Sequence, residues 1–215
     1  MEDEIVDGRV NKYMRALLDR HDESVLLEME EIARFSEFRI INRHVGVTVE
    51  ILARAIGARR VFELGSGYGY SAFWFARAVG PDGEVHCTDQ DAQNAKMAQE
   101  FLSRANLWDR IRFHVGDALA SFMQAAGKWD IVYVDIDKRS CAEAWNAARD
   151  RIRVGGMYIA DNAISIGLPG SKELVMDSVE LENVIEHNKI ISNDDRYLSS
   201  ILPIRDGVMI ALRLR

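Results

Sequence analysis

The sequence predicts an α/β fold built around a mostly parallel sheet. Three observations favour it: short apolar runs alternate with helical segments from residue 59 onward, a glycine-rich turn follows the first run, and the last two runs have no helix between them. Strands that alternate with helices form βαβ units, whose parallel strands are covered by helices on both faces. We expect one domain over all 215 residues, with residues 1–57 as an N-terminal helical extension and 58–215 as the α/β core.

The N-terminal extension is expected to contain three helices, at residues 8–19, 22–36 and 44–57. The second carries a mostly apolar stripe with acids on the opposite side. That stripe consists of Leu26, Leu27, Glu30, Ile32, Ala33 and Phe35. Gly57 ends the third helix, because glycine readily adopts the left-handed conformation at a helix C-terminus.

The core is expected to contain seven strands, at residues 59–64, 84–89, 111–117, 130–135, 156–161, 197–204 and 207–214. Helical patterns lie between or beside them, at residues 70–79, 91–104, 118–126, 138–150 and 172–190. The last two strands are separated by Asp206-Gly207, a pair that is typical of hairpin turns. The parallel sheet should therefore end in an antiparallel hairpin.

Composition excludes several classes of protein. Hydrophobic residues make up 48% and charged residues 28%, which is typical of globular chains. There is no uncharged apolar stretch of ~18 residues, so no membrane-spanning helix is expected. The acidic start of the chain does not resemble a signal peptide. Cys87 and Cys141 form neither a disulfide framework nor a CxxC metal site, so we expect the protein in the cytoplasm.

The net charge of −7 is distributed unevenly along the chain. The first 31 residues carry six of these seven negative charges, and the remainder of the chain is close to neutral. A broad basic surface for nucleic acid is therefore not indicated, although a local basic patch remains open.

The first strand leads into a glycine-rich turn, ELGSGYGYS, over residues 63–71. Glycine lets the backbone approach a ligand closely, and open α/β sheets bind ligands at the carboxyl ends of strands. The G-x-G-x-G spacing of Gly65, Gly67 and Gly69 differs from the G-x-G-x-x-G of dinucleotide-binding loops. Glu63 suits a ligand with an ammonium group or hydroxyls better than a diphosphate. The alternative is a purely structural turn.

Acids also end the next two strands. Asp89 is placed to accept hydrogen bonds from ribose hydroxyls. Asp117 is placed either to accept from an adenine amino group or to cap the following helix. These strand ends describe a nucleoside with a cationic appendage, which S-adenosylmethionine fits better than NAD. The expected contacts are Glu63, Gly65, Ser66, Gly67, Ser71, Asp89, Asp117 and Ala118.

Six segments together carry a family resemblance: ELGSGYGYSA, CTDQD, GDAL, YVDIDK, IRVGGMYIADN and LPIRDGVMIALR. In order and spacing they resemble the cation-dependent O-methyltransferases, which include caffeoyl-CoA and catechol O-methyltransferases and small bacterial relatives. The resemblance runs from about residue 5 to the C-terminus. It implies a Rossmann-like, seven-stranded methyltransferase fold with a reversed terminal strand. It also implies S-adenosylmethionine, a divalent cation, a vicinal-diol aromatic substrate and, as in many members, a homodimer.

Two carboxylates and an amide end the fourth and fifth strands, which neighbour each other in such a sheet. These hard oxygen ligands suit Mg²⁺, with Mn²⁺ or Ca²⁺ as alternatives. By resemblance, Asp135, Asp161 and Asn162 bind the metal, while Asp135 and Asp137 lie beside the cofactor. The structural alternative is that these strand-end acids cap helices.

Lys138 follows Asp135 by three residues and is the expected catalytic base. A metal lowers the pKa of a coordinated hydroxyl. A lysine beside it can take the released proton if the cation depresses the pKa of the lysine itself. The alternative is an exposed lysine at the start of a helix.

The leading hypothesis is a metal-dependent methyltransferase that acts on a catechol-like or other phenolic small molecule. An alternative is a tRNA-modifying enzyme that methylates a hydroxylated wobble uridine. A third, a non-catalytic S-adenosylmethionine-binding protein, is disfavoured by the intact ligand set and lysine. Cys141 and Ser165 stand where relatives often carry aromatic residues, so the acceptor pocket should differ from theirs.

Overall fold

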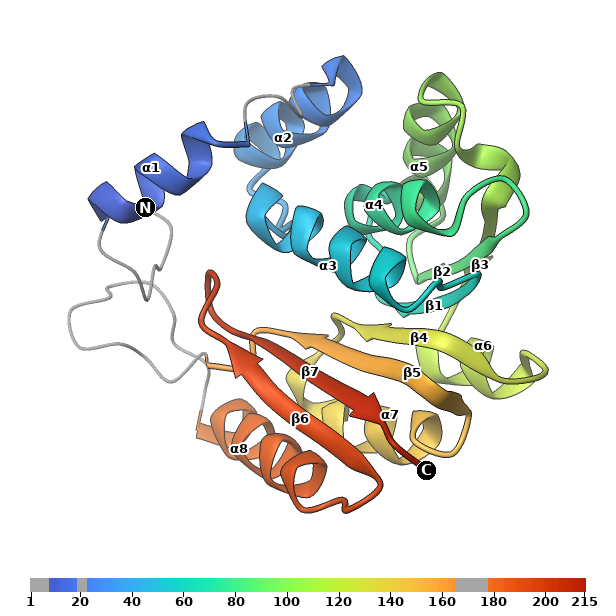
Figure 1. Cartoon of the computed structure of the whole chain (residues 1–215). Coiled ribbons are helices and arrows are strands. Elements are labelled where there is room, and N and C mark those ends of the chain that lie inside the picture. Colours follow the sequence, from blue (N-terminus) through green and yellow to red (C-terminus); the bar gives the residue numbers. More distant parts are fainter. Residues whose placement is uncertain (1–7, 19–22, 165–177) are drawn as a thin grey trace.

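The computed structural model describes residues 8–18, 23–164 and 178–215. Its centre is a seven-stranded sheet in the order β3-β2-β1-β4-β5-β7-β6 (Figure 1). The strands are β1 Arg60–Leu64, β2 Glu84–Asp89, β3 Ile111–Val115, β4 Trp129–Val134, β5 Ile152–Asp161, β6 Tyr197–Leu202 and β7 Val208–Arg213. Strands β1 to β5 pair in parallel, and β7 runs antiparallel to both β5 and β6. The predicted sheet and its terminal hairpin are confirmed.

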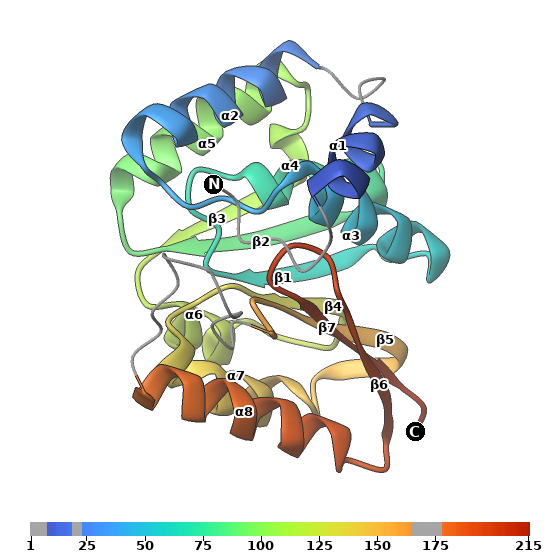
Figure 2. The ribbon, with the colours of Figure 1, turned by 90° about the vertical axis from the view of Figure 1, so that its left-hand side faces the viewer.

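Helices cover both faces of the sheet. They are α1 Gly8–Ala16, α2 Ser24–Ser36, α3 Arg43–Ala55, α4 Tyr70–Val79, α5 Ala92–Arg104, α6 Ala118–Gln124, α7 Cys141–Ala148 and α8 Ser178–Ser192. Helices α3, α4 and α5 lie over one face, and α6, α7 and α8 lie over the other (Figures 1 and 2). Successive residues of β4 enter opposite cores: Ile131 and Tyr133 join one, and Val132 and Val134 join the other. This alternation explains why the strand is apolar from Ile131 to Val134.

The stripe predicted for α2 was wrong at two positions. Val25, Leu26, Met29 and Ala33 face the core, whereas Leu27 is 45% exposed and Phe35 is 74% exposed. Positions 26, 29 and 33 follow the i, i+3, i+7 spacing of one helix face, and residue 35 falls on the opposite side. The N-terminal helices therefore present apolar side chains to the outside of the chain.

Two core boundaries also differ from the prediction. Strand β5 begins at Ile152 instead of at the predicted residue 156, because Ile152 pairs with Trp129. The helix predicted over 138–150 is divided into a 3₁₀ turn at Lys138–Ser140 and α7. The Asp137 carboxylate accepts a hydrogen bond from the Arg139 amide at 2.9 Å and fixes this turn.

Parts of other predicted elements lie outside the described residues. These parts include the start of the predicted helix at 172–190, and Ser165. In the stretches of chain that are described, no helix has the length and apolar character needed to cross a membrane.

The turn between β6 and β7 has Arg205 and Asp206 at its centre, rather than the predicted Asp206-Gly207. The Gly207 amide donates to the Ile204 carbonyl at 2.9 Å, and Arg205 has a φ of 53°. Because β7 is antiparallel to β5 and Val208 pairs with Asp161, this turn lies at the carboxyl end of β5. The hairpin thus brings a distant part of the sequence to the edge of the sheet where ligands bind.

Candidate functional site

Two adjoining cavities lie at the carboxyl ends of the parallel strands. The central cavity has a volume of about 430 Å³. The β2–β3 cavity, of about 340 Å³, extends toward the residues that follow β2 and β3. Both are lined by Gly65, Asp89, Asp135, Ile136 and Asp137. The predicted cofactor residues Ser66, Gly67 and Ser71 line the central cavity, and Asp117 and Ala118 line the other. The sequence-predicted strand ends are therefore brought together.

Gly65 is the point at which three strand ends meet. Its amide donates to Thr88 Oγ1 at 3.0 Å, and the next amide, of Ser66, donates to the Thr88 carbonyl at 2.8 Å. Gly65 has a φ of 83°, and a Cβ atom placed on it would lie 2.2 Å from the Asp135 carbonyl oxygen. Only glycine fits this contact, which holds the end of β1 against the residue that follows β4.

Glu63 lies beneath the cavities and lines neither of them. Its side chain is fully buried, and its carboxylate has no hydrogen-bond partner among the described residues. Burial raises the pKa of Glu63 to about 7. The nearby hydroxyls of Ser66 and Ser71 oppose this rise, although neither completes a hydrogen bond to the carboxylate. The contact between Glu63 and a ligand stays a prediction, and in this structure the Glu63 side chain lies outside the lining of both cavities.

This buried carboxyl should make stability depend on pH. Between pH 4.5 and about 7, folded Glu63 keeps a proton that the unfolded chain has released, so its contribution to stability is lost as pH rises through this range. We expect Glu63→Gln to be more stable than the wild type at pH 8 by about 2–3 kcal/mol, with little difference at pH 5. Urea unfolding at both pH values measures this.

The control is Glu100→Gln, whose parent side chain is 69% exposed on α5. It should follow the wild type at both pH values. An equal urea midpoint for Glu63→Gln and the wild type at pH 8 would contradict the buried carboxyl.

Asp89 and Asp117 are held by local hydrogen bonds. Asp89 Oδ1 accepts from the Asp91 amide at 2.8 Å and from the Asn94 side-chain amide at 3.0 Å. Asp117 Oδ1 accepts from the Ala120 amide at 2.7 Å and caps α6. The capping role left open for Asp117 is therefore present, and Asp117 also lines the β2–β3 cavity.

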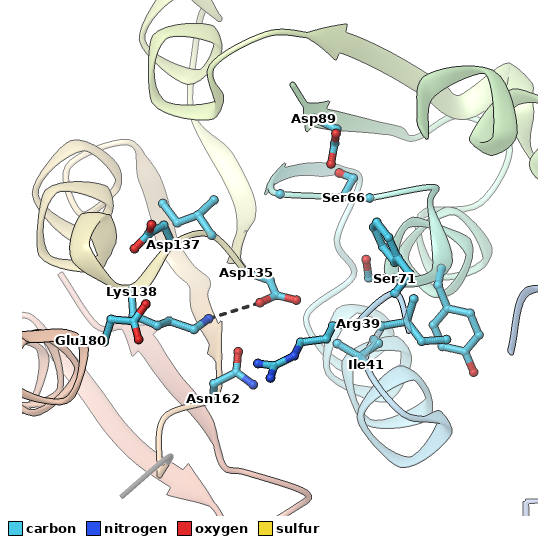
Figure 3. Close-up of a pocket in the computed structure, with 16 residues that line it drawn as sticks. Arg39, Ile41, Ser66, Ser71, Asp89, Asp135, Asp137, Lys138, Asn162 and Glu180 are labelled. Atoms are coloured by element: carbon cyan, nitrogen blue, oxygen red, sulfur yellow. Dashed lines mark hydrogen bonds and ion pairs between the residues drawn. The ribbon is translucent and has the colours of Figure 1, made fainter. Parts of the chain in front are cut away.

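The predicted metal ligands follow two adjacent strands. Val134 pairs with Ala160, so the next residues, Asp135 and Asp161, lie side by side at the sheet edge. Lys138 Nζ lies 3.2 Å from Asp135 Oδ1 (Figure 3). Asp161 Oδ2 accepts from Arg205 Nη1 at 3.1 Å. All predicted members of this constellation are thus close together, with an arginine that the sequence reasoning did not include.

This donor set fits a divalent cation in its chemistry. Asp161 Oδ1 is buried and has no hydrogen-bond partner among the described residues, which leaves a strong acceptor atom unsatisfied. Carboxylate and amide oxygens are the ligands that Mg²⁺, Mn²⁺ and Ca²⁺ prefer. The described chain has no group of three or more His, Cys, Asp or Glu side chains arranged to hold a metal. A cation here would therefore need Asn162 and oxygens from outside the chain, in addition to the carboxylates of Asp135 and Asp161.

The charge state of Lys138 differs from the one expected of a base. Burial opposes its charge, but the carboxylates of Asp135 and Asp161 outweigh burial and raise the pKa of Lys138 above its ordinary value. Burial and the neighbouring Asp135 raise the pKa of Asp161, whereas the charges of Arg205 and Lys138 oppose that rise. Lys138 is therefore an ammonium ion at neutral pH as long as these carboxylates have no other cation.

Charged residues that the sequence did not predict also line these cavities, among them Arg39, Glu180 and Arg205. Arg39, from the segment between α2 and α3, points toward Asp135 and Asn162 (Figure 3). Glu180 of α8 also lines the central cavity. Nothing in the local sequence marks either residue. The position of Arg205 could have been predicted from the terminal hairpin. A last strand antiparallel to β5 begins at the carboxyl end of β5, so the turn before it lies near Asp161.

A third cavity, of about 460 Å³, adjoins the central one through shared lining residues that include Arg39 and Tyr70. We call it the arginine cavity after the arginines in its wall, Arg15, Arg34, Arg39, Arg43 and Arg205. Among the lining residues that the structure describes, the acid is Glu30, which pairs with Arg43 at 2.8 Å and accepts from the Tyr70 hydroxyl at 2.5 Å. The wall is therefore strongly basic, although the chain as a whole is acidic.

Comparisons with known proteins agree with this geometry. Catechol O-methyltransferase from Niastella koreensis is 29% identical over 163 residues, which cover 74% of each chain. Catechol O-methyltransferase from Mycobacterium tuberculosis is 37% identical over 118 residues, or 54% of each chain. These relatives support an enzyme that transfers methyl groups to oxygen, and they do not favour the tRNA alternative.

Solved structures share the fold. A methyltransferase from Geobacter sulfurreducens superposes with a TM-score of 0.84 at 29% identity, over 99% of this chain and 100% of that one. An O-methyltransferase from Bacillus cereus, determined in complex with SAH, superposes with a TM-score of 0.77 at 23% identity, over 89% and 91% of the two chains. The O-methyltransferase family itself matches residues 21–214, nearly the whole chain. The protein therefore belongs to the O-methyltransferase family and is an enzyme of that kind.

Proposed function

We propose that the protein uses S-adenosylmethionine and a divalent cation to methylate a hydroxyl of a catechol-like or other phenolic small molecule. The observation that carries this proposal is the Asp135, Asp161 and Lys138 cluster, which adjoins the glycine loop at one edge of the sheet. The cluster combines cation ligands with a proton acceptor, and methyl transfer to a phenol uses both.

S-adenosylmethionine would supply an electrophilic methyl group. The β2–β3 cavity suits its nucleoside, because Asp89 opens into both cavities. Ser66, Gly67 and Ser71 then line the path toward Asp135. The SAH in the Bacillus cereus structure supports this cofactor. The reaction would form an O–CH₃ bond, break the S–CH₃ bond and leave S-adenosylhomocysteine, while the hydroxyl proton would pass to the Nζ of Lys138 in its neutral form.

Asp135, Asp161 and Asn162 would hold the divalent cation, which lowers the pKa of an acceptor hydroxyl when bound. Mg²⁺ is the first choice, and Mn²⁺ or Ca²⁺ are alternatives. The carboxylates that raise the pKa of Lys138 are the ones such a cation would neutralise. Lys138 can then lose its proton more readily and accept one from the acceptor.

The arginine cavity suits an acceptor that carries an acidic group. Arg39 lines both this cavity and the central one, and it points toward the carboxylate cluster. It makes no ion pair with any residue that the structure describes. A carboxylate on the acceptor would give this guanidinium a planar partner with two hydrogen-bond acceptors.

Arg39→Ala should therefore raise the KM for 3,4-dihydroxybenzoate by about tenfold, because a hydrogen bond to a charged group is lost. The KM for unsubstituted catechol should change much less. Arg34→Ala is the matched control, since Arg34 lines the arginine cavity but not the central one. Steady-state kinetics with both acceptors measure the difference. An equal rise in KM for both acceptors would show that Arg39 does not bind the acidic group of the acceptor.

The proposed function is tested by a methyl-transfer screen with catechol, 3,4-dihydroxybenzoate and tRNA. Transfer to the catechols should require S-adenosylmethionine and should stop when a chelator removes divalent ions. Full activity in excess chelator would exclude the metal role. Transfer to tRNA alone would exclude the phenolic substrate.

We also propose a homodimer in the cytoplasm. Apolar side chains on α1, on the turn after it and on α2 face outward, among them Val10, Tyr13, Leu17, Leu27 and Phe35. Exposed apolar side chains support this proposal where they gather on a surface that binds a second chain. The two free, buried cysteines suit a reducing compartment. Light scattering at micromolar concentration should give twice the monomer mass, and the monomer mass alone would refute the dimer.

A further inference from the structure

Arg205 places a guanidinium against the carboxylate that is expected to hold the metal. Its Nη1 lies 3.1 Å from Asp161 Oδ2, and its Nε lies 3.9 Å from Asp206 Oδ1. The Asp161 side chain is 0% exposed and the Arg205 side chain is 20% exposed, so water screens this pair poorly. A positive charge that belongs to the protein thus already occupies one oxygen of the predicted ligand.

The backbone holds Arg205 in an unfavourable conformation to make this contact. Its φ of 53°, together with the hydrogen bond from the Gly207 amide to the Ile204 carbonyl, is typical of a turn whose first central residue is glycine. A non-glycine residue in this region has a conformational cost that the surrounding structure must outweigh. The ion pairs of Arg205 with Asp161 and Asp206 are the interactions that can do so.

The turn is also fastened to the end of β5. The Ala163 amide donates to the Gly207 carbonyl at 2.8 Å, and the Ile164 amide donates to the Asp206 carbonyl at 2.7 Å. The Asn162 side-chain amide donates to the Asp206 carboxylate. Because the turn and the residues after Asp161 are joined in this way, the backbone that carries the guanidinium is held beside the end of β5.

The charges around Asp161 show what the guanidinium does. Among the charges that act on Asp161 are those of the acids Asp135 and Asp206 and of the bases Lys138 and Arg205. Lys138 pairs with Asp135, which leaves Arg205 as the direct partner of Asp161. Asp161 and Asp206 are both buried, and burying these two carboxylates without a cation would cost stability. A divalent ion bound at the same carboxylate would in turn be repelled by the fixed guanidinium.

We propose that Arg205 is a built-in counter-cation of this site: it balances Asp161 when no divalent ion is bound, and it lowers the affinity of the site for a divalent ion. The inference rests on the metal ligands assigned in the proposed function. It makes Arg205 a residue that sets metal affinity, and it does not touch the reacting atoms.

The test is Mn²⁺ binding, measured by electron paramagnetic resonance on the full chain without acceptor. Arg205→Gly should bind Mn²⁺ about tenfold more tightly than the wild type or better, because a fixed positive charge is removed from beside the ion. Glycine also suits the positive φ, so the turn should be kept. Arg205→Gln, which removes the charge but keeps most of the side chain, should give the same direction of change.

Thermal unfolding gives a second readout. In a chelator, Arg205→Gly should unfold at a lower temperature than the wild type, since Asp161 has lost its partner. Saturating Mn²⁺ should raise the midpoint of Arg205→Gly by more than it raises that of the wild type. Arg39→Ala is the control, because it removes a guanidinium from the arginine cavity, which Arg205 also lines, without removing the pair with Asp161.

The outcomes separate this inference from the proposed function. Equal Mn²⁺ affinity in the wild type and both Arg205 variants, with binding lost in Asp161→Ala, overturns the inference and leaves the metal site intact. A gain in Arg39→Ala as large as that in Arg205→Gly also overturns it. Binding that survives Asp161→Ala, or is absent from every variant, overturns the metal assignment and the inference together.

Discussion

Replacing Lys138 by alanine is expected to slow methyl transfer at neutral pH by about 10²–10⁴-fold, the usual contribution of a positioned proton acceptor. Lys138 Nζ lies 3.2 Å from Asp135 in the central cavity. The Lys138 side chain is 12% exposed, so water has little access to take over its role as proton acceptor. The affinity for S-adenosylmethionine should remain close to that of the wild type, because the proposed nucleoside site lies in the β2–β3 cavity. Initial rates and calorimetric titration measure the two effects.

Two features distinguish loss of a base from loss of structure. Part of the rate should return at higher pH in Lys138→Ala, as the acceptor ionises without help. Lys138→Arg should not restore activity, because arginine keeps its proton near neutral pH. Lys128→Ala, which changes an exposed lysine ahead of β4, is the matched control and should retain full activity. Wild-type turnover in Lys138→Ala at neutral pH would assign the base to another residue.

The fold could be predicted because its signals are local. Apolar runs with glycine or acidic residues at their ends mark β1, β2, β4 and β5 separately, and parallel strands separated by helices allow few arrangements. The same signals identified most of the site, since residues that follow parallel strands meet at one edge. Gly65, Asp89, Asp135 and Asn162 all line the central cavity for this reason.

The direction of a strand-end side chain could not be predicted in the same way. Glu63 precedes the glycine loop, yet it is buried beneath it, because the side chains of β1 alternate between the two faces of the sheet. Phe62 and Leu64 join one core, and Glu63 points to the other side. Sequence alone does not say whether that side is open to a ligand or closed by Ser66 and Ser71.

Residues from distant segments were beyond the local pattern. Arg39 enters the site from the segment between two N-terminal helices, and Arg205 enters from the final hairpin. Their positions depend on how helices pack on the sheet and on the register of β5 with β7. The charge state of Lys138 depends on the same arrangement, because the carboxylates that raise its pKa come from two strands.

Gly65→Ala is expected to remove measurable S-adenosylmethionine binding and to lower stability by roughly 2–5 kcal/mol. The added Cβ would lie 2.2 Å from the Asp135 carbonyl oxygen. Because this oxygen belongs to the backbone, no side-chain rotation can relieve the overlap. The alanine would also have to adopt a φ of 83°. Either the glycine loop or the segment that carries Asp135 must move, and both line the two cavities.

Gly57→Ala separates the two parts of this effect. Gly57 has a φ of 61°, but a Cβ atom there would meet nothing within 4 Å, so the variant carries the conformational cost without the overlap. It should lose a smaller part of its stability and bind the cofactor normally. Asp89→Ala gives the opposite comparison, because it should weaken cofactor binding by about 1.5–3 kcal/mol while the fold keeps its stability. If Gly65→Ala matched Gly57→Ala in urea unfolding and in cofactor titration, the close approach of β1 to Asp135 would not be what builds the site.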